Sequence, residues 1–405
     1  MQYHALALAV NAGDVDLVGL EGAPLHAALT AEPRLHSHRL SDSRFKSRAA
    51  GGRSRFVWMS AARATLQAGS LLKTLLRLPK PDVILVQNPP AAPTLAVAWA
   101  AARIRGARLI IDWHNLSHSI LAVPLGEHHR AVRSLMRVER RWGRRADAHL
   151  AVSQTLAEWL KRQWNIQATV LYDRPTAFFA KPSLDAANEL WQRLARELNL
   201  GSRRVPLVVC PTSWTPDEDF DLLLEALERT DRTLTAERGK DTAADLAVLL
   251  TGRGALRDDV SKRISRREFK HVAVRTVWLE PADYPVLVGM ADAGLCLHRS
   301  SSGLDLPMKL ADFRGAGVPA CAYDYAPVLS EVLTPGREGV TFRDPGELTT
   351  VLLALAHADL TSVPAFASAR AWLTAHPIER WEEQWTRVAG PVLDAPTPSP
   401  LVQGS

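Results

Sequence analysis

The chain has 405 residues, of which 47% are hydrophobic and 23% are charged. This length allows two domains with separate cores, and this composition excludes a disordered protein. The formal net charge is +6, but none of the usual nucleic-acid-binding motifs occurs, so nucleic acid is not an expected partner.

The N-terminus and the cysteines indicate the compartment. Residues 1–10 are short and lack a basic flank, so they do not predict a signal peptide. The longest apolar stretch, 93–102, is followed by Arg103 and Arg105, which favours a helix packed on a sheet over a membrane span. Cys210, Cys296 and Cys321 lie in apolar runs without CxxC spacing. We therefore expect buried, reduced thiols, no zinc site and a cytoplasmic location.

In the first half of the chain, short apolar runs alternate with helical patterns. Strands are predicted over 15–19, 83–87, 108–112 and 148–153, and helices over 60–78, 94–105 and 130–145. This alternation is typical of a parallel sheet with crossover helices.

A second alternation follows, with strands predicted over 205–210, 247–251, 273–277, 293–297 and 319–323. We predict an α/β fold with two doubly wound, Rossmann-like parallel-sheet domains facing a cleft. The expected parts are an N-terminal domain at 1–175, a linker at 176–204, a C-terminal domain at 205–376, a C-terminal helix at 377–394 that could cross back, and a disordered tail at 395–405.

Basic residues gather in one region of the first domain. Five of them crowd a Ser/Gly-rich loop, and three more follow an apolar helical pattern: Arg44, Lys46, Arg48, Arg53, Arg55, Lys73, Arg77 and Lys80. A basic loop beside an amphipathic helix is typical of a peripheral protein on an anionic membrane. A solvated basic surface around a core-packing helix remains the alternative.

In the first domain, polar residues follow two of the predicted strands. Asp112 and His114 come at the end of strand 108–112, followed by Asn115, and Asn88 ends the preceding strand. A histidine oriented by a carboxylate could take a proton from an attacking hydroxyl. Asp112 or His114 could equally cap the following turn. Asn88 suits contacts with hydroxyl groups or the shaping of a loop.

In the second domain, two strand ends offer groups for a nucleotide sugar. The sequence after strand 205–210 carries Thr212, Ser213 and Thr215, and Thr215 with Glu218 reads as a capping box at a helix start. TGRG at 251–254 places Arg253 between Gly252 and Gly254. Glycines allow the backbone to approach a phosphate closely, and an arginine can neutralise it. The turn at 283–285 is a candidate lip for a nucleobase.

A loop of small residues follows strand 293–297. It contains Ser301, Ser302 and Gly303 and leads to Asp305, Pro307, Lys309 and Asp312. Pro307 predicts a helix start, and backbone N–H groups at such a start can hold an anion. Lys309 adds a positive charge, and we expect Asp305 and Asp312 to lie on one face of the helix. Small-residue loops are also common in α/β proteins without a ligand.

Taken together, these motifs resemble the chitobiosyldiphosphodolichol beta-mannosyltransferase family. The resemblance spans the chain to about Trp385 and rests on VQNPP at 86–90, DWHN at 112–115, YDRP at 172–175, TSWTPDEDFDLLLEAL at 212–227, TGRG at 251–254, WLEPADYPVL at 278–287 and HRSSSGLDLPMK at 298–309. It implies a GT-B glycosyltransferase that takes GDP-mannose as donor, inverts the anomeric carbon and requires no metal. The implied acceptor is a polyprenyl-diphosphate-linked saccharide at the cytoplasmic face of a membrane.

The resemblance also implies roles for individual residues. Arg253 and Lys309 would hold the diphosphate, and the hydroxyl groups listed next would line the donor side: Thr212, Ser213 and Thr215. Asp305 and Asp312 match a pair of acidic positions that bind sugar and ribose hydroxyls, although Asp312 replaces the usual glutamate. Asp112 and His114 become the candidates for the acceptor-activating base, with His114 favoured and Asp112 orienting it.

The chain departs from the familiar members in two respects. Those members have a strand and a Gly-rich loop ahead of a segment like residues 1–5. We therefore expect either that Met1 is internal to a longer protein or that the first strand is missing. The N-terminal anchor of eukaryotic members is the second feature that we do not find in this sequence. The Ala/Arg-rich composition favours a bacterial relative. Two alternatives remain: a GT-B transferase for UDP-GlcNAc or another GDP-sugar, and a non-catalytic GT-B partner subunit.

Overall fold

The computed structural model describes residues 1–21, 25, 27–40, 53–201, 203–239, 244–376 and 378–395. The predicted basic residues Arg44, Lys46 and Arg48 and the tail beyond residue 395 lie outside these ranges, as do the side chains of 53–64. The chain forms two compact units. Unit 1 comprises 1–172 and 382–405, and unit 2 comprises 173–381. The C-terminal segment therefore belongs to the unit formed by the first half of the chain.

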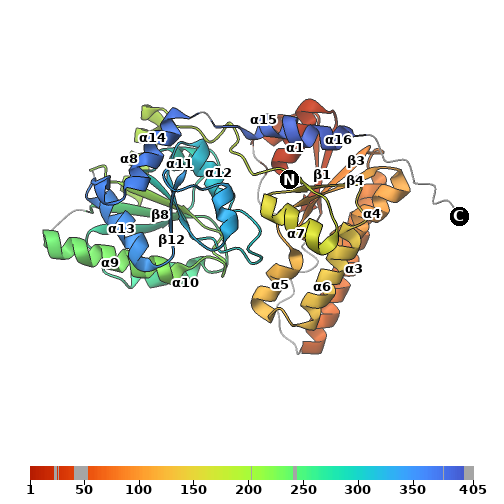
Figure 1. The fold of residues 1–405 in the computed structure, drawn as a ribbon, viewed down its shortest axis with the longest axis horizontal. Coiled ribbons are helices and arrows are strands. Elements are labelled where there is room, and N and C mark those ends of the chain that lie inside the picture. Colours follow the sequence, from red (N-terminus) through yellow and green to blue (C-terminus); the bar gives the residue numbers. More distant parts are fainter. Residues whose placement is uncertain are drawn as a thin grey trace. The chain divides into compact units, whose positions relative to one another are not determined.

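The described part of unit 1 contains two parallel sheets. The strands β1 (Val15–Leu20) and β2 (Leu35–Leu40) form one sheet, and β3 (Val83–Asn88), β4 (Arg108–Trp113), β5 (Ala148–Ala151) and β6 (Thr169–Val170) form the other, in that order. The helices are α1 (Gln2–Asn11), α2 (Ala27–Ala31), α3 (Arg53–Arg77), α4 (Thr94–Arg105), α5 (Ser117–Leu125), α6 (Arg130–Gly143) and α7 (Gln154–Trp164) (Figure 1).

Unit 2 is built on a single parallel sheet within the described residues. Its strand order is β12 (Gly339–Phe342), β11 (Ala320–Tyr323), β10 (Ala293–Cys296), β7 (Leu207–Pro211), β8 (Leu246–Thr251) and β9 (Val272–Val277). The helices are α8 (Leu184–Glu197), α9 (Phe220–Arg238), α10 (Arg257–Ser265), α11 (Asp283–Gly289), α12 (Lys309–Gly315), α13 (Pro345–Ala356) and α14 (Pro364–Ala375), with 3-10 turns η2 (Pro327–Glu331) and η3 (Leu360–Ser362).

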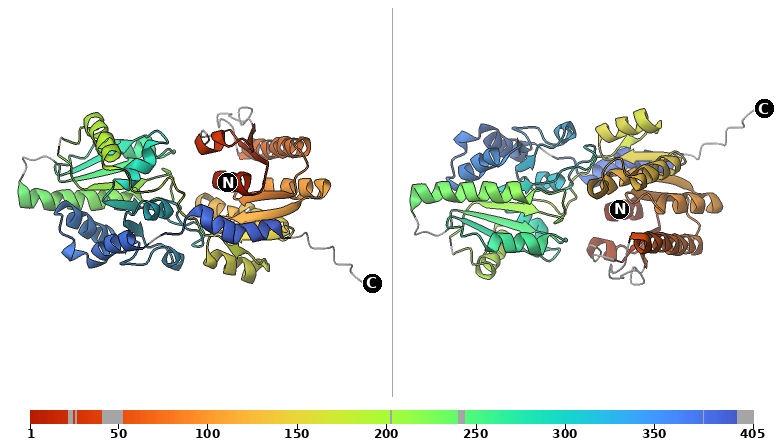
Figure 2. Two further views of the ribbon diagram at one scale, coloured as in Figure 1. Left: turned by 90° about the horizontal axis from the view of Figure 1, so that it is seen from above. Right: turned by 90° about the horizontal axis from the view of Figure 1, so that it is seen from below.

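Helices cover both faces of the unit 2 sheet, as both views in Figure 2 show. Val208 and Cys210 of β7 pack in a core with α9, α10, α13 and α14. Leu207 and Val209 of the same strand pack on the other face with α8 and α11. Alternate residues of β7 are thus buried on opposite faces, which explains why the strand reads as a continuous apolar run. All three cysteines are buried and free, as predicted.

The strand order of unit 2 determines where a ligand can bind. The chain starts at β7, moves outward through β8 and β9, and then returns to add β10 on the other side of β7. In open parallel sheets, ligands bind at the carboxyl ends of the two strands where the order reverses. In this sheet those strands are β7 and β10, and the segments that follow them are 212–219 and 297–308.

The predicted strands are confirmed to within a few residues, and helix 94–105 coincides with α4. The strand predictions missed β2, β6 and β12, and the helix predictions missed α1, α2, α5, α7, α8, α10, α11, α13 and α14. Residues 176–204 were expected to form a linker, but they carry α8, whose Leu190, Trp191 and Leu194 are buried in the unit 2 core. The predicted C-terminal helix is three short pieces: α15 (Trp381–Gln384), the π-helical η4 (Trp385–Ala389) and α16 (Gly390–Asp394).

Candidate active site

The end of β4 carries a buried carboxylate with two histidines. Asp112 is 1% exposed, and its Oδ2 atom lies 2.7 Å from Nε2 of His114 and 3.1 Å from Nε2 of His4. We call these three residues the Asp112 cluster. β4 is buried along its whole length, and the chain leaves the sheet after Trp113, so His114 is half-buried at the sheet edge. The structure thus joins Asp112 to His114 and adds His4, on α1, to the pair.

The Asp112 cluster holds a negative charge away from water. Burial raises the pKa of the Asp112 carboxyl, but the charges and hydrogen bonds of His114 and His4 outweigh burial and leave this pKa well below its usual range. A carboxylate that stays ionised can orient an imidazole and stabilise its protonated form. The cluster therefore has the chemistry of a general base.

Glu139 of α6 connects the neighbouring strand end to α5. The Glu139 carboxylate is fully buried and accepts hydrogen bonds from Asn88 Nδ2 at 2.7 Å, Ser117 N at 2.7 Å and His118 Nδ1 at 2.7 Å. Asn88 also donates to the carbonyl of Asn115. Asn88 was predicted either to contact hydroxyl groups on the acceptor side or to shape a loop. It is fully buried, and its hydrogen bonds fit the second role. Asn115 Oδ1 accepts from Leu116 N at 2.7 Å, which starts the turn into α5.

In unit 2, the segments after β7 and β10 meet at the point where the strand order reverses. Glu218 and His298 form an isolated backbone bridge, and Arg299 N donates to the carbonyl of Asp217 at 2.8 Å. The predicted donor-binding residues Thr212, Ser213, Thr215, Ser301, Ser302 and Gly303 all belong to these two segments. The Oγ1 atom of Thr212 is buried and has no hydrogen-bond partner among the described residues. The local arrangement therefore matches the ligand site of a doubly wound sheet.

His298 lies between two carboxylates. Its Nδ1 atom is 3.2 Å from Asp217 Oδ2, and its Nε2 atom is 3.2 Å from Asp305 Oδ2. Burial opposes protonation of His298, but the hydrogen bonds that its ring donates to Asp217 and Asp305 prevail and raise its pKa to about 9. The His298 hydrogen bond also lowers the pKa of Asp217 to about 2. Ser300 donates to Asp305 as well, and its Oγ accepts from Gly303 N at 2.8 Å. His298 therefore organises the Ser-rich loop as a cation at neutral pH.

We expect the His298→Gln substitution to reduce stability most at low pH. The folded-state pKa of about 9 exceeds the value of 6.5 for a free histidine, which corresponds to about 3 kcal/mol of stabilisation. Because the pKa is raised on folding, this contribution is complete below pH 6.5 and disappears as the pH rises through 9. Urea unfolding should show a large difference between wild type and variant at pH 6 and a small one at pH 10. The exposed His36, changed to Gln, is the control. An equal difference at both pH values would contradict the ion pairs.

Glu218 and Lys309 form an ion pair across the same two segments. Lys309 Nζ donates to Glu218 Oε1, and Glu218 Oε2 accepts from the backbone N–H groups of Ser213 and Trp214, each at 2.9 Å. The predicted capping box is therefore wrong. Helix α9 begins at Phe220 with Asp219 as its N-cap, because the Glu218 carboxylate is used by the 213–214 backbone and by Lys309.

The glycines of the TGRG motif allow two loops to approach each other closely. A Cβ atom on Gly252 would lie 1.9 Å from the Thr212 carbonyl oxygen, and one on Gly254 would lie 1.9 Å from that of Ser213. These glycines were predicted to make room for a phosphate, whereas in the structure they make room for the backbone after β7. The guanidinium of Arg253 lies 3.6 Å from the centre of the Trp278 ring. Arg253 thus stacks on an exposed aromatic side chain at the edge of this site.

The Gly252→Ala substitution should destabilise unit 2 by a few kcal/mol, because the new Cβ overlaps a carbonyl and Gly252 has a φ of +129°. Gly13 is a matched control, since its φ is +134° but no atom lies within 4 Å of the position of a Cβ. Thermal unfolding of both alanine variants separates the overlap from the backbone strain. Equal losses at Gly13 and Gly252 would show that the loop contact contributes nothing.

Asp305 and Asp312 do not share a helical face, contrary to the prediction. Helix α12 begins at Lys309, so Asp305 and Pro307 precede it, and Pro307 forms a turn with its carbonyl accepting from Leu310 N. Asp312 accepts a hydrogen bond from Tyr284 at 3.1 Å. Burial raises the pKa of Asp312 to about 7, with the Asp173 charge adding to the rise and the Tyr284 hydrogen bond opposing it. Asp312 is therefore partly protonated at neutral pH.

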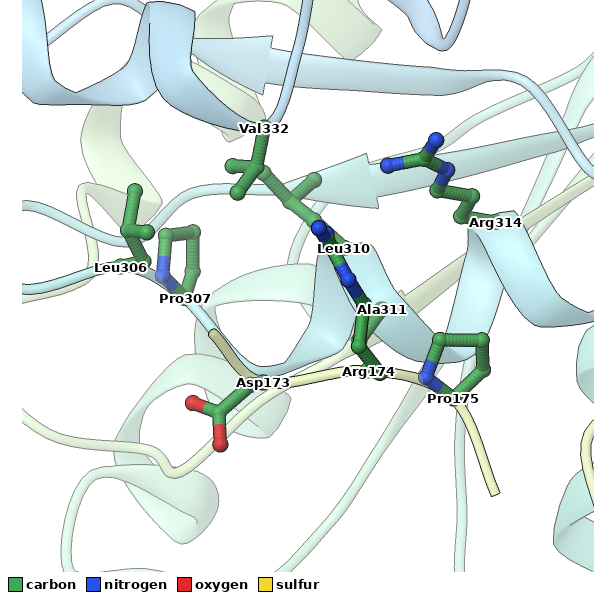
Figure 3. A pocket seen from close by; sticks show the side chains of 9 residues that line it. All are labelled: Asp173, Arg174, Pro175, Leu306, Pro307, Leu310, Ala311, Arg314 and Val332. Carbon is green, nitrogen blue, oxygen red and sulfur yellow. The ribbon is translucent and has the colours of Figure 1, made fainter. Parts of the chain in front are cut away.

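A small pocket lies beside α12, where the chain enters unit 2. Figure 3 shows Asp173, Arg174 and Pro175 running along one side of α12. The remaining lining residues are Leu306, Pro307, Leu310, Ala311, Arg314 and Val332. None of the predicted donor-binding residues lines this pocket. Residues 173–175 of the YDRP motif thus pack against the helix that carries Lys309 and Asp312.

The sequence patterns missed four residues of these clusters: His4, Glu139, His298 and Trp385. Trp385 is 2% exposed, and its Nε1–H donates to His4 Nδ1 at 3.1 Å. A lone histidine in an alanine-rich helix or a tryptophan near the C-terminus carries no local signal. Asp305 and His298, seven residues apart, could have been paired from the loop that joins them.

Comparison with known proteins identifies relatives that span nearly the whole chain. Residues 5–171 match the family model described as a glycosyl transferase 4-like domain. The chain is 34% identical to the chitobiosyldiphosphodolichol beta-mannosyltransferase of Mus musculus, covering 97% of this chain and 86% of that protein. It is 35% identical to the Arabidopsis thaliana protein UDP-glycosyltransferase TURAN, covering 97% and 94%.

Solved glycosyltransferase structures share the fold. The structure of HepE from Anabaena in complex with UDP and glucose superposes with a TM-score of 0.67 at 14% identity, covering 97% of this chain and 96% of that one. WaaG, a glycosyltransferase involved in lipopolysaccharide biosynthesis, superposes with a TM-score of 0.60 at 11% identity, covering 98% and 95%. The predicted GT-B fold is thereby confirmed.

Proposed function

Because this chain belongs to the chitobiosyldiphosphodolichol beta-mannosyltransferase family, we propose that it transfers mannose from GDP-mannose to a lipid-diphosphate-linked saccharide. The reaction inverts the anomeric carbon. The observation that carries the proposal is the pair formed by His114 and Asp112, with 2.7 Å between Nε2 and Oδ2. It supplies a base that works near neutral pH, within a chain whose relatives are named mannosyltransferases.

Unit 1 supplies the base. His114 takes the proton of the acceptor hydroxyl while the hydroxyl oxygen forms a bond to the anomeric carbon of mannose. The bond from this carbon to the diphosphate oxygen breaks in the same displacement, and its electron pair leaves with GDP. Asp112 stabilises the imidazolium that forms on His114. One displacement with one base accounts for inversion.

Unit 2 holds the donor. Lys309 and Arg253 stabilise the negative charge that develops on the leaving diphosphate. Backbone N–H groups of the loops after β7 and β10 contribute to the same stabilisation. Asp305 and Asp312 accept from sugar and ribose hydroxyls, and Thr212, Ser213 and Thr215 line the same side. These cations take the role that a metal ion has in other transferases, so transfer should continue in the presence of EDTA.

The acceptor is attached to a lipid, and one surface of unit 1 suits an anionic membrane. Helix α5 exposes Ile120, Val123 and Leu125 by 46%, 56% and 44%. The neighbouring helix α6 and its C-cap expose six arginines, at positions 130, 133, 137, 140, 141 and 144. Apolar side chains beside a row of cations match lipid tails and anionic headgroups.

Among the described residues, none of the helices has the length and apolarity to cross a bilayer. We therefore propose peripheral binding, and the three free cysteines support the reducing, cytoplasmic side.

Vesicle sedimentation tests the membrane surface without any sugar transfer. The triple variant Ile120→Ser, Val123→Ser and Leu125→Ser should lose most binding to vesicles that contain phosphatidylglycerol. Leu184→Ser is the control, because Leu184 is 80% exposed in unit 2. Wild-type binding by the triple variant would assign the membrane contact to another surface.

The donor is tested by incubating purified protein with labelled GDP-mannose and a chitobiosyl-diphospho-lipid. Formation of the mannosylated lipid, with a β linkage shown by digestion with β-mannosidase, is the expected result. A second candidate keeps the fold but uses a UDP-sugar, because one relative is named a UDP-glycosyltransferase and HepE binds UDP and glucose. Calorimetric titration with GDP and UDP distinguishes the two, and tighter binding of UDP would overturn GDP-mannose as the donor.

A further inference from the structure

A chain of hydrogen bonds runs from the C-terminal segment to the proposed base. Trp385 Nε1 lies 3.1 Å from His4 Nδ1, His4 Nε2 lies 3.1 Å from Asp112 Oδ2, and the same oxygen lies 2.7 Å from His114 Nε2. Trp385, His4 and Asp112 are each at most 2% exposed. These hydrogen bonds connect η4, α1 and β4, and all of the residues involved belong to unit 1.

The tryptophan determines which nitrogen of His4 carries the hydrogen. An indole N–H donates and cannot accept, so His4 Nδ1 must present a lone pair to Trp385. Neutral His4 then carries its hydrogen on Nε2, where it donates to Asp112. His114 also turns Nε2 toward the carboxylate, so its own hydrogen lies there and its Nδ1 atom keeps the lone pair that a base requires.

A metal ion is the competing explanation of this cluster. His4, Asp112 and His114 each offer one ligand atom, and these atoms all lie within 4.8 Å of one another. A ligating His4 would present the lone pair of Nε2 to the metal and carry its hydrogen on Nδ1. That hydrogen would then point at the N–H of Trp385, and two donors would oppose each other. A ligating histidine normally donates its second N–H to an acceptor, so the Trp385 contact favours the hydrogen-bond chain.

We propose that Trp385 and His4 are positioning residues for the base. Trp385 keeps His4 neutral and oriented as a hydrogen-bond donor, so the negative charge of Asp112 can stabilise the protonated form of His114. The inference rests on the proposed function, since it assigns His114 as the base. Without the indole N–H, His4 is free to take a second proton on Nδ1. The resulting cation shares the Asp112 charge and opposes protonation of His114 by like-charge repulsion.

Among the described residues, groups from β4, α1, β3 and the C-terminal segment lie around the cluster. His114 on the β4 end and His4 on α1 act on Asp112. From β3, Gln87 lies opposite Asp112, and its Oε1 atom accepts from the amino group of Met1 at 3.3 Å. From the C-terminal segment, the neutral indole of Trp385 donates to His4. A change in the protonation of His4 therefore directly alters the electrostatic interaction between Asp112 and His114.

The pH profile of kcat tests the proposal in the full-length protein. Trp385→Phe keeps the ring and removes the N–H, so we expect kcat at pH 7 to fall about tenfold. The acidic limb of log kcat should move to lower pH by about one unit, while the KM for the donor stays unchanged. A role in packing alone would lower the activity or the stability but would leave the position of the limb where it is in the wild type.

His4 variants provide matched comparisons. His4→Gln keeps an N–H donor for Asp112 but cannot be protonated, so its kcat should stay close to that of the wild type, whereas His4→Leu should lose about tenfold. In the His4→Gln background, Trp385→Phe should no longer move the acidic limb. An equal shift in both backgrounds would overturn the proposal, because the two residues would then act independently.

A spectroscopic measurement separates this inference from the proposed function. In protein labelled with nitrogen-15 at histidine, His4 should show a protonated Nε2 and an unprotonated Nδ1, with no dependence on donor or acceptor. Trp385→Phe should change this pattern. A protonated Nδ1 in the wild type, or His4 signals that change on addition of Zn²⁺ or EDTA, would overturn the hydrogen-bond chain in favour of the metal. Loss of transfer with the expected His4 tautomer would instead count against the mannosyltransferase assignment alone.

Discussion

The His114→Ala substitution is expected to lower kcat by about 10²- to 10⁴-fold, the usual contribution of a general base. The imidazole is the group that receives the acceptor proton, and Asp112, 2.7 Å away, keeps it correctly oriented. Asp112→Asn should produce a loss of similar size, because an amide cannot stabilise the imidazolium. The KM for the donor should change little, since unit 2 holds the nucleotide sugar. Initial rates with a chitobiosyl-diphospho-lipid measure both values.

A matched control for His114 exists in the same unit. His38 Nε2 lies 2.7 Å from Asp16 Oδ1 in the small sheet, so this pair has the same geometry as His114 with Asp112. His38→Ala should therefore keep nearly all of the activity. If cells depend on the protein but tolerate both His114→Ala and His38→Ala, the chain acts as a non-catalytic GT-B partner subunit and the proposed mechanism fails.

The Lys309→Met substitution should lower kcat by about 10²- to 10³-fold. Lys309 is a half-buried cation at the start of α12, after the loop that follows β10, and we assign it to the diphosphate that leaves with the nucleoside. Removal of one preorganised group that stabilises a developing negative charge costs this much in other enzymes. Lys262→Met is the control, because Lys262 is exposed on α10. Single-turnover rates at saturating donor separate the chemical step from donor binding.

The same substitution should also destabilise unit 2, and a second change separates this effect from catalysis. Without Lys309, the buried carboxylate of Glu218 loses its ion-pair partner, which costs about 3–5 kcal/mol. Gln at position 218 still accepts from Ser213 N and Trp214 N through its amide oxygen. The double variant Lys309→Met with Glu218→Gln should therefore recover much of the stability but none of the activity. Recovery of activity would show that Lys309 serves the fold only.

Much of the fold was predictable because parallel strands buried on both faces leave a strong pattern. β4, β7 and β8 are buried along their whole length and mostly apolar, and helix α4 has Gly106, with a φ of +66°, as its C-cap. The pair formed by Asp112 and His114 was also predictable, since two residues separated by one position at a strand end stay close in any such fold.

Other features depended on contacts that no local pattern records. The Thr215–Glu218 spacing fits a capping box, yet Glu218 accepts from the 213–214 backbone and from Lys309, 91 residues further along the chain. Asn88 stands at the end of a strand, where a ligand-binding residue is expected. Its side-chain amide instead donates a hydrogen bond to Glu139, 51 residues away. In both cases a buried charge acquired its partners from distant segments, and this overrode the local preference.

The sequence by itself determined the alternation of strands and helices, the family and the positions of the polar loops, because each of these depends on residues that are close together in the sequence. Only the tertiary structure decided how those loops are used. His4 reaches Asp112 across 108 residues and Trp385 reaches His4 across 381. A hydrogen bond depends on the distance between two atoms and not on the separation of their residues along the chain, so the partners of the base became visible only after α1, β4 and η4 were packed together.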